Sequence, residues 1–465
     1  MAGQPSPPAQ QHTERAAEYA QRGELKSAES ELRQALELSP NDPALLTSLG
    51  GILGMEGDLK QANVYLSKAV KLNPQDALLR RNLAANQWQL GQFREAHQNL
   101  ERLIRANPQD KHAIFLLGMV SENQKDYARS IALLESIPEI TERQPEARVA
   151  LASAYFRSNR AEEARQTVRE LLHRPVDPRI MFTAGRVAMD AHDYSLAETV
   201  FTSLRSAYPD PAVLEFQIAL AQYRDRRVAQ SERTLTEAVA ANRANQDSYV
   251  LLSQILAGRG DPVQALKVAA RGSQAFPNSS NILSAKAAIE MKLQYFGDAV
   301  ASNEKAARLN PLAAGVRRDL AVAEWRAGMR ERSEASFRDA IRQFPGDAET
   351  YLAYAVLLLE EGSPDARSRA IQLLGQALAR DDSSIEARYQ LANIALEDGK
   401  PEQALAHLEF AVKRDPQASR VRYALSRTYQ RLGRSSDADR EMEMYQKLKA
   451  AQPSDVRSDS PAEIH

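Results

Sequence analysis

The sequence repeats itself with a period of about 34 residues along nearly its whole length. Segment 43–74 aligns with segment 77–108 at the pairs Leu49/Leu83, Gly57/Gly91, Ala62/Ala96, Leu66/Leu100 and Pro74/Pro108. The same frame predicts thirteen repeats, starting at residues 9, 43, 77, 111, 145, 178, 212, 246, 280, 314, 348, 385 and 419. One residue is lost near Pro175 and three are gained after Gly362. Such a chain folds as an array of similar units, each touching its neighbours.

Each repeat contains two blocks of apolar residues at helical spacing, which predicts two amphipathic helices. Glycine ends the first block in eight repeats, where a left-handed residue closes a helix: Gly23, Gly57, Gly91, Gly260, Gly328, Gly362, Gly399 and Gly433. Proline follows the second block in many repeats and cannot continue a helix. Asp42, Asp76, Asp110 and Asp347 then stand where the next helix needs an N-cap.

A small residue lies five residues after the break between the two helices in most repeats, eight after it in repeat 11. This column reads Ala28, Ala62, Ala96, Ser130, Ala164, Ala197, Ser231, Ala265, Ala299, Ser333, Ala370, Ala404 and Ala438. The first helix also offers small residues, among them Ala16, Gly50, Ala84, Gly118, Ala152, Gly185, Ala219 and Ala321. We therefore expect the two helices of each hairpin to approach closely, to about 8–10 Å between axes.

These columns resemble the tetratricopeptide repeat family, and the resemblance covers nearly the whole chain. It implies an all-α solenoid, a right-handed superhelix of helical hairpins whose first helices line a concave face. We expect one array over residues 9–450, with residues 1–8 and 451–465 as disordered tails rich in Pro, Ser and Asp. The last helix, predicted over residues 440–449, should cap the array through Met442, Tyr445 and Leu448.

Composition limits the possible partners and the compartment. The formal net charge is −1, so no overall basic field attracts nucleic acid, and we expect no nucleic-acid partner. The longest apolar run, residues 351–359, is too short to span a bilayer. The N-terminal residues lack the basic and apolar regions of a signal peptide, which predicts a cytoplasmic location. A periplasmic or secreted location is the alternative if a signal peptide precedes Met1 in the gene.

Motifs for catalysis, metals and cofactors are missing from the sequence. There is no cysteine, and none of the seven histidines has the spacing of a metal ligand. Gly50, Gly51, Gly54 and Gly57 lack the strand and the Gly-Lys-Ser/Thr end of a phosphate loop. We therefore expect no enzyme activity, no cofactor, no metal site and no small-molecule substrate.

Two sub-types of the family carry diagnostic residues that are not found here. Chaperone-binding members of the family resemble one another in having Lys at the fifth and Asn at the ninth repeat position. In this chain, repeats 1 and 2 have Thr13/Ala17 and Thr47/Gly51 at these positions. The asparagine ladder of the O-GlcNAc transferase array needs Asn at the sixth position, where only Asn82 matches among the first seven repeats. Neither function is carried over to this chain.

Repeats 4–7 differ from the others at the fifth, ninth and twelfth positions, which we expect to point toward the inner face. They carry apolar side chains there, with arginines beside them: Phe115, Met119, Phe156, Phe182, Arg186, Met189, Phe216, Leu220, Tyr223 and Arg224. One interpretation is a groove for an apolar or acidic peptide. The other is that the aromatic rings pack between adjacent first helices as core.

The function predicted from these features is a non-catalytic scaffold or adaptor that holds protein or peptide segments on its concave face. Two alternatives stay open. One is a subunit of an envelope assembly for polysaccharide export or secretion. The other is a substrate-docking subunit whose catalytic part lies on another chain. The identity of the partner does not follow from the sequence.

Overall fold

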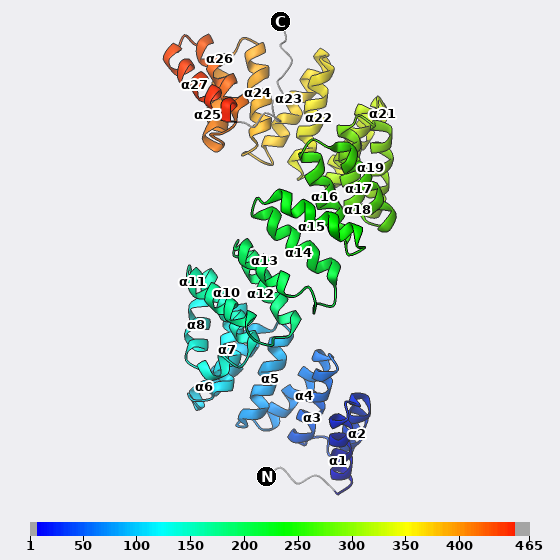
Figure 1. Ribbon diagram of the computed structural model, residues 1–465, viewed down its shortest axis with the longest axis vertical. Helices are drawn as coiled ribbons and strands as arrows, with labels where there is room; N and C mark the ends of the chain where they lie inside the picture. Colours follow the sequence, from blue (N-terminus) through cyan, green and yellow to red (C-terminus); the bar gives the residue numbers. More distant parts are fainter. Residues whose placement is uncertain (1–6, 452–465) are drawn as a thin grey trace. The chain divides into compact units, whose positions relative to one another are not determined.

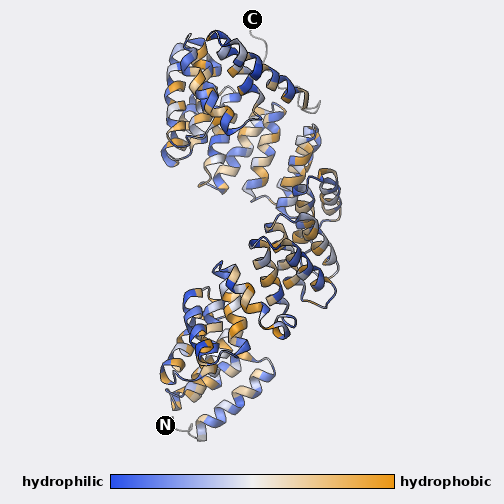
Figure 2. Ribbon diagram, turned by 90° about the vertical axis from the view of Figure 1, so that its left-hand side faces the viewer, coloured by the Kyte–Doolittle hydropathy of each residue, from blue (hydrophilic) through white to orange (hydrophobic). Residues whose placement is uncertain are grey.

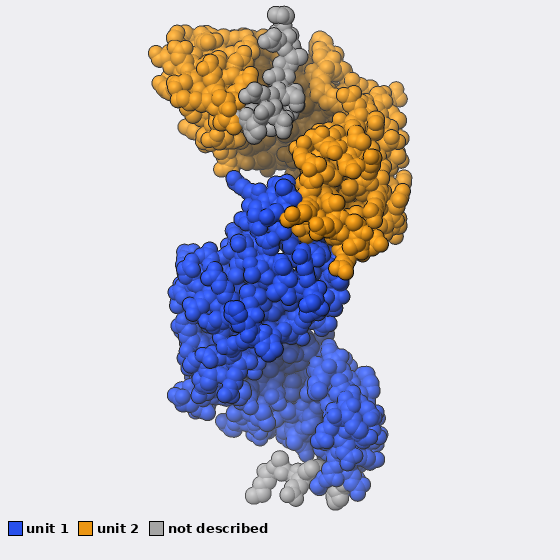
Figure 3. All heavy atoms as spheres, viewed as in Figure 1, with its two compact units in different colours: residues 1–231 blue, residues 232–465 orange. Residues whose placement is uncertain are grey.

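The computed structural model describes residues 7–451, and within that range it contains helices and no strand. The contacts divide the chain into two compact units, Met1–Ser231 and Glu232–His465 (Figure 3). The sequence suggested no boundary between residues 9 and 450, so a single continuous array remains a prediction, as does its superhelical path. Each unit is a succession of helical hairpins (Figure 1).

The first unit holds the hairpins of repeats 1–6 and the first helix of repeat 7. Its helices are α1 (Pro7–Gln21), α2 (Leu25–Leu38), α3 (Pro43–Met55), α4 (Leu59–Leu72), α5 (Ala77–Gln89), α6 (Phe93–Ala106), α7 (Lys111–Asn123), α8 (Tyr127–Glu135), α9 (Pro138–Thr141), α10 (Pro145–Arg157), α11 (Ala161–Leu172), α12 (Pro178–Asp190), α13 (Tyr194–Ser203) and α14 (Pro211–Arg224). The boundary between the units falls within α15 (Val228–Ala240).

The second unit holds the hairpins of repeats 8–13. Its helices are α16 (Gln246–Gly258), α17 (Pro262–Ala275), α18 (Ser280–Lys292), α19 (Phe296–Leu309), α20 (Ala314–Arg326), α21 (Arg330–Gln343), α22 (Ala348–Glu361), α23 (Pro364–Leu378), α24 (Ile385–Glu397), α25 (Pro401–Arg414), α26 (Ser419–Arg431) and α27 (Ser435–Ala451).

The predicted all-α solenoid of helical hairpins is confirmed. Eleven of the thirteen first helices begin at the residue predicted as a repeat start, and α14 begins one residue early, at Pro211. Helix α1 begins at Pro7, so Pro7 and Pro8 of the predicted N-terminal tail are helical, and Ala451 still belongs to α27. The rest of both predicted tails, residues 1–6 and 452–465, lies outside the described residues.

Every hairpin turns through one residue with a positive φ. In eight repeats this is the predicted glycine, with φ between 70° at Gly399 and 93° at Gly260. In the other five the same position holds a residue with a side chain: Lys125, Asn159, His192, Arg226 and Gln294. The geometry of the turn is therefore kept even where the residue is not glycine, at a cost of about 1–2 kcal/mol for an ordinary side chain.

Aspartate starts many of the first helices, as predicted. Asp42 accepts hydrogen bonds from the backbone N–H groups of Ala44 and Leu45, and Asp76 and Asp110 cap α5 and α7 in the same way. Asp347 also occupies the N-cap position of α22, as predicted, but its carboxylate accepts a hydrogen bond from the hydroxyl of Thr350 and none from the backbone of α22.

The column of small residues lies at the centre of each hairpin. All thirteen members are buried, with an exposed fraction of 0% or 1%. Where the column holds serine, the hydroxyl donates a hydrogen bond to a carbonyl of the first helix: Ser130 to Gly118, Ser231 to Ala219 and Ser333 to Ala321, at 2.9, 2.8 and 2.7 Å. Serine therefore replaces alanine here without an unpaired buried hydroxyl.

Apolar side chains from both helices of a hairpin, and from the first helix of the next repeat, form the core. Figure 2 shows hydrophobic and hydrophilic residues alternating around the helices, as expected for amphipathic helices. In the first unit the first helices of neighbouring repeats also touch, α7 against α10 and α10 against α12. Each of these first helices is therefore already in contact with the first helix of a neighbouring repeat.

Repeat 4 departs from the predicted pair of helices. Its second helix α8 ends at Glu135, and the short helix α9 follows from Pro138. Pro138 has no N–H group to continue the hydrogen bonds of α8. Helix α8 therefore ends, and α9 begins at Pro138. Ile137 and Thr141 are buried at this break, and the hydroxyl of Thr141 donates to the carbonyl of Leu134.

The last helix, α27, begins at Ser435, five residues before the predicted start. Met442, Tyr445 and Leu448 are half-buried in it, and the ring of Tyr445 lies 5.2 Å from that of Tyr423. These three side chains are thus partly covered, while Glu443 and Lys447 on the same helix are exposed.

Candidate functional site

The ten residues of the predicted groove lie on the first helices α7, α10, α12 and α14 (Figure 1). All of them belong to the first compact unit. They divide into a buried group that packs into the core and a more accessible group on α12 and α14.

The buried group is on the N-terminal side. Met119 is only 8% exposed and belongs to the core between α8 and α10, so the prediction that it lines an accessible groove is wrong. Phe115 and Phe156 are half-buried and pack against the same core. These side chains fit the second interpretation made from the sequence, in which the rings pack between neighbouring helices.

Phe182 is also held by its neighbours. Its ring lies 5.2 Å from the fully buried ring of Phe201 and is stacked at 4.6 Å on the ring of Tyr208. Tyr208 follows α13, which ends early at Ser203. Helical periodicity does not identify Tyr208, because this residue lies outside both predicted apolar blocks of repeat 6.

The accessible group consists of Arg186 and Met189 on α12 and Phe216, Leu220, Tyr223 and Arg224 on α14, and we call it the first-helix patch. Met189, Phe216 and Leu220 are half-buried, and Tyr223 is 40% exposed. Arg186 and Arg224 are exposed, and within residues 7–451 neither forms an ion pair or a side-chain hydrogen bond. The patch thus combines apolar surface with two free guanidinium groups.

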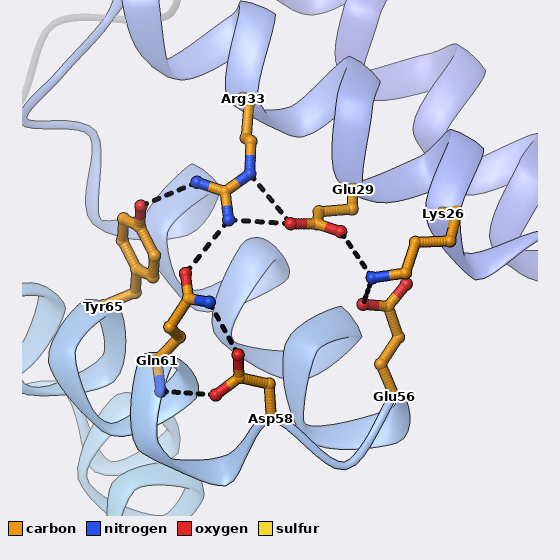
Figure 4. Close-up of polar contacts among 7 residues, drawn as sticks. All are labelled: Lys26, Glu29, Arg33, Glu56, Asp58, Gln61 and Tyr65. Atoms are coloured by element: carbon orange, nitrogen blue, oxygen red, sulfur yellow. Dashed lines mark hydrogen bonds and ion pairs between the residues drawn. The ribbon is translucent and has the colours of Figure 1, made fainter.

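Ion pairs and hydrogen bonds link the neighbouring repeats 1 and 2. In Figure 4, Lys26 bridges Glu29 of its own helix and Glu56 of the next repeat, at 3.1 and 2.8 Å. Arg33 donates to Glu29, Gln61 and Tyr65. The hydrogen bonds from Arg33 and Lys26 lower the pKa of Glu29, which therefore stays ionised and holds the two α2 side chains that reach the next repeat.

Two buried tyrosines repeat one arrangement in different repeats. The Tyr155 hydroxyl donates to Glu135 at 2.7 Å, and the Tyr429 hydroxyl donates to Glu409 at 3.0 Å. Arg160 and Arg434 lie over the two rings, each at 4.4 Å. Burial and the glutamate raise the pKa of Tyr429 to about 12, and the pKa of Tyr155 is raised by the same causes.

These shifted pKa values have a structural explanation. Each glutamate is the twenty-fifth residue of its repeat and bonds to the following repeat, as do Glu101 to Arg129 and Glu304 to Arg332. An acidic residue at this position therefore links neighbouring hairpins. The signal in the sequence is a glutamate that recurs at this position, as at Glu101, Glu135, Glu304 and Glu409.

The described part of the chain has neither a metal-binding cluster nor a helix that could span a membrane. Residues 7–451 contain no group of three or more His, Asp or Glu residues placed to hold a metal ion. Burial and the charge of Arg388 lower the pKa of His407. The buried Nδ1 atom of this histidine has no hydrogen-bond partner among the described residues. None of the described helices is long and apolar enough to cross a membrane.

Comparisons with known proteins agree with the repeat pattern. Two family models, both described as tetratricopeptide repeat, match the chain. One matches residues 55–120, 123–180 and 395–458, and the other matches residues 216–280, 285–348 and 318–385. A comparison with curated proteins found no match.

Several solved structures are similar to the chain. Yeast Tom70 is 16% identical, with 97% of each chain covered and a TM-score of 0.45. The Cut9–Hcn1 hetero-tetramer of the APC/C is 12% identical, with 90% of this chain and 96% of that chain covered and a TM-score of 0.40. PilF of Pseudomonas aeruginosa is 22% identical, with 43% and 92% covered and a TM-score of 0.36. Similarity with identities and TM-scores this low carries no conclusion about function.

Proposed function

The chain belongs to the tetratricopeptide repeat family, and from this premise we propose that it is a non-catalytic scaffold that binds an extended segment of a partner protein on the first-helix patch. The observation that carries the proposal is the pair of free guanidinium groups, Arg186 and Arg224, beside half-exposed apolar side chains. Most other arginines on the hairpins are engaged by a carboxylate or a carbonyl, as Arg165 is by Asp193 and Arg271 by the carbonyl of Val239.

The chemistry of the patch suits a polypeptide. Tyr223, Phe216 and Leu220 offer apolar area that is partly in water, and such area marks interaction sites on folded proteins. A guanidinium binds a carboxylate or two backbone carbonyls through parallel N–H bonds. The two arginines lie on the first helices of consecutive repeats, so they can fix the register of a bound segment.

The patch is smaller than the groove expected from the sequence. It leaves out Met119, which is core, and it treats Phe115, Phe156 and Phe182 as support for the helices rather than as contact residues. The proposal therefore places binding at repeats 6 and 7.

The experiment is affinity capture from the native host with the full chain, followed by mass spectrometry and measurement of the affinity for each retained protein. A patch variant carries Arg186→Gln, Tyr223→Ala and Arg224→Gln. Its matched control carries Arg243→Gln, Lys267→Gln and Tyr295→Ala, which are exposed residues of the second unit; Tyr295 is 50% exposed.

We expect the patch variant to lose a partner that the wild type and the control variant both retain. Loss of one hot-spot aromatic with its flanking charges typically weakens binding by about 2 kcal/mol or more. Both variants should keep the helical circular dichroism spectrum of the wild type, since all six side chains are exposed. If the patch variant retains every partner with unchanged affinity, the proposal is wrong.

A further inference from the structure

The second helices of repeats 2 and 3 carry the same pattern of positive charges. Lys60, Lys68 and Lys71 on α4 occupy repeat positions 18, 26 and 29, and Arg94, Arg102 and Arg105 on α6 occupy the same positions. Steps of eight and three residues keep a side chain on one side of a helix. With about 1.5 Å of rise per residue, each row of three is about 16 Å long.

These six side chains are exposed, and four of them have no partner. Within residues 7–451, Lys60, Lys71, Arg94 and Arg102 form no ion pair and no side-chain hydrogen bond. Lys68 donates to the carbonyl of Pro40 at 2.8 Å, and Arg105 lies 3.7 Å from Glu101. Both residues at position 18, and one residue each at positions 26 and 29, therefore carry charge that the fold does not use.

A surface hollow of about 400 Å³ adjoins the α6 row. It is lined by His97, Gln98, Glu101, Arg102, Arg105 and Arg129, the last from α8. Glu101 is the one carboxylate in this lining and is already paired with Arg129. Burial and the charge of Arg102 lower the pKa of nearby Arg80, a sign of repulsion between cations at this place.

The second helices α2 and α11, before and after these repeats, carry more acidic than basic residues. Helix α2 carries Glu29, Glu31 and Glu37 against Lys26 and Arg33, and α11 carries three glutamates against two arginines. The whole chain has a formal net charge of −1. A basic surface only three helices wide, with acidic surface on either side, suits a short anionic ligand better than a long polyanion or a flat membrane.

We propose that the basic strip, defined as Lys60, Lys68, Lys71, Arg94, Arg102, Arg105 and Arg129, binds an acidic segment of a partner protein. The two rows occupy the same positions on the second helices of consecutive repeats, so one extended segment can contact both. An extended segment advances about 3.3 Å per residue, so a stretch of a few acidic residues spans one row. The strip lies on second helices and is therefore separate from the first-helix patch.

The test measures binding of a fluorescent oligoglutamate peptide to the full chain by anisotropy. An ionic strength of about 0.01 M is chosen because the Debye length is then about 30 Å. The strip variant carries Lys71→Gln, Arg94→Gln and Arg102→Gln, three exposed residues without partners. The control variant carries Lys267→Gln, Lys305→Gln and Lys413→Gln, which remove the same charge from exposed sites of the second unit.

We expect the wild type to bind the peptide, the control variant to bind within about twofold of it, and the strip variant to bind about tenfold or more weakly. A variant with Arg186→Gln and Arg224→Gln should bind oligoglutamate as the wild type does, which separates this proposal from the first-helix patch. Absence of binding by the wild type, or equal loss in the strip and control variants, overturns the proposal. Equally tight, strip-dependent binding of anionic vesicles or of a single-stranded oligonucleotide also overturns it, in favour of a general polyanion surface.

Discussion

The ring of Phe182 is stacked on the ring of Tyr208, with the two centroids 4.6 Å apart and the planes 16° from parallel. Phe182 comes from the first helix of repeat 6, and Tyr208 comes from the segment that follows its shortened second helix. The stack covers the end of this hairpin, where most other second helices continue for another turn. A residue that looked like a binding residue in the sequence is thereby tied to the stability of repeat 6.

Phe182→Ala should destabilise repeat 6 by about 2–4 kcal/mol, because it removes a half-buried ring from contact with Phe201 and Tyr208. Tyr223→Ala, at a residue that is 40% exposed, should cost about 1 kcal/mol or less. Hydrogen exchange of α12 and α13 measures the first value locally, and hydrogen exchange of α14 measures the second. Equal protection in the two variants would show that the Phe182 ring contributes little to packing.

Gly185→Ala should destabilise the same hairpin by about 1–3 kcal/mol, since a Cβ there would lie 2.5 Å from Cε1 of the fully buried Phe201. The control is Gly51→Ala in α3, where nothing lies within 4 Å of the added carbon. There alanine should stabilise the helix by about 0.5–1 kcal/mol. Urea unfolding of both variants gives the sign of each change, and opposite signs are expected.

Gln294→Gly should stabilise repeat 9 by about 1 kcal/mol, because Gln294 has a φ of 61° and glycine adopts this conformation without strain. The reciprocal change in the next repeat, Gly328→Gln, should destabilise it by a similar amount, since φ there is 79°. Thermal unfolding compares the two. The prediction is contradicted if Gln294→Gly lowers the melting temperature.

Acid should loosen the junction of repeats 1 and 2. The pKa of Glu29 is lowered in the folded chain by its bonds to Arg33 and Lys26, so its contribution is complete above the unfolded pKa, about 4.3, and is lost as the pH falls through the folded pKa. Hydrogen exchange of α2 and α4, measured as the pH is lowered from 6 to about 3, follows this loss.

Glu29→Gln should remove most of this pH dependence and reduce protection of α2 and α4 already at neutral pH. Glu37→Gln is the control on the same helix, at an exposed carboxylate with no partner among the described residues. If both variants lose protection with acid as the wild type does, the ion pairs of Figure 4 do not determine the acid response.

The sequence predicted the repeat starts almost to the residue because up to three separate signals coincide in a hairpin. A left-handed residue at the break, a small residue such as Ala197 and a proline after the second helix all fix the same register. The three residues gained after Gly362 are likewise confirmed. They add a first turn to α23, so that the buried Ala370 keeps its place.

The candidate site was less predictable, because periodicity places a side chain on a face but does not say what covers it. The pattern predicts that Met119 and Tyr223, at the ninth and twelfth positions of their repeats, both face inward, yet one is 8% and the other 40% exposed. Met119 is covered because it packs in the core with residues of α8 and α10. The break of α8 at Pro138 and the links through Glu135 and Glu409 also require knowledge of neighbouring repeats. The predicted cytoplasmic location remains a prediction.

The glutamates that link one hairpin to the next have a mechanical consequence. Each bond of this kind, such as Tyr155 to Glu135, spans a single junction. If the chain is pulled from its two ends, a junction can yield while those beyond it hold, because no contact in such an array ties distant repeats together. Extension should then proceed as a series of small steps under nearly constant force, and hairpins should re-form one by one when the load is released. We therefore expect a chain built in this way to extend and shorten reversibly in steps of one repeat.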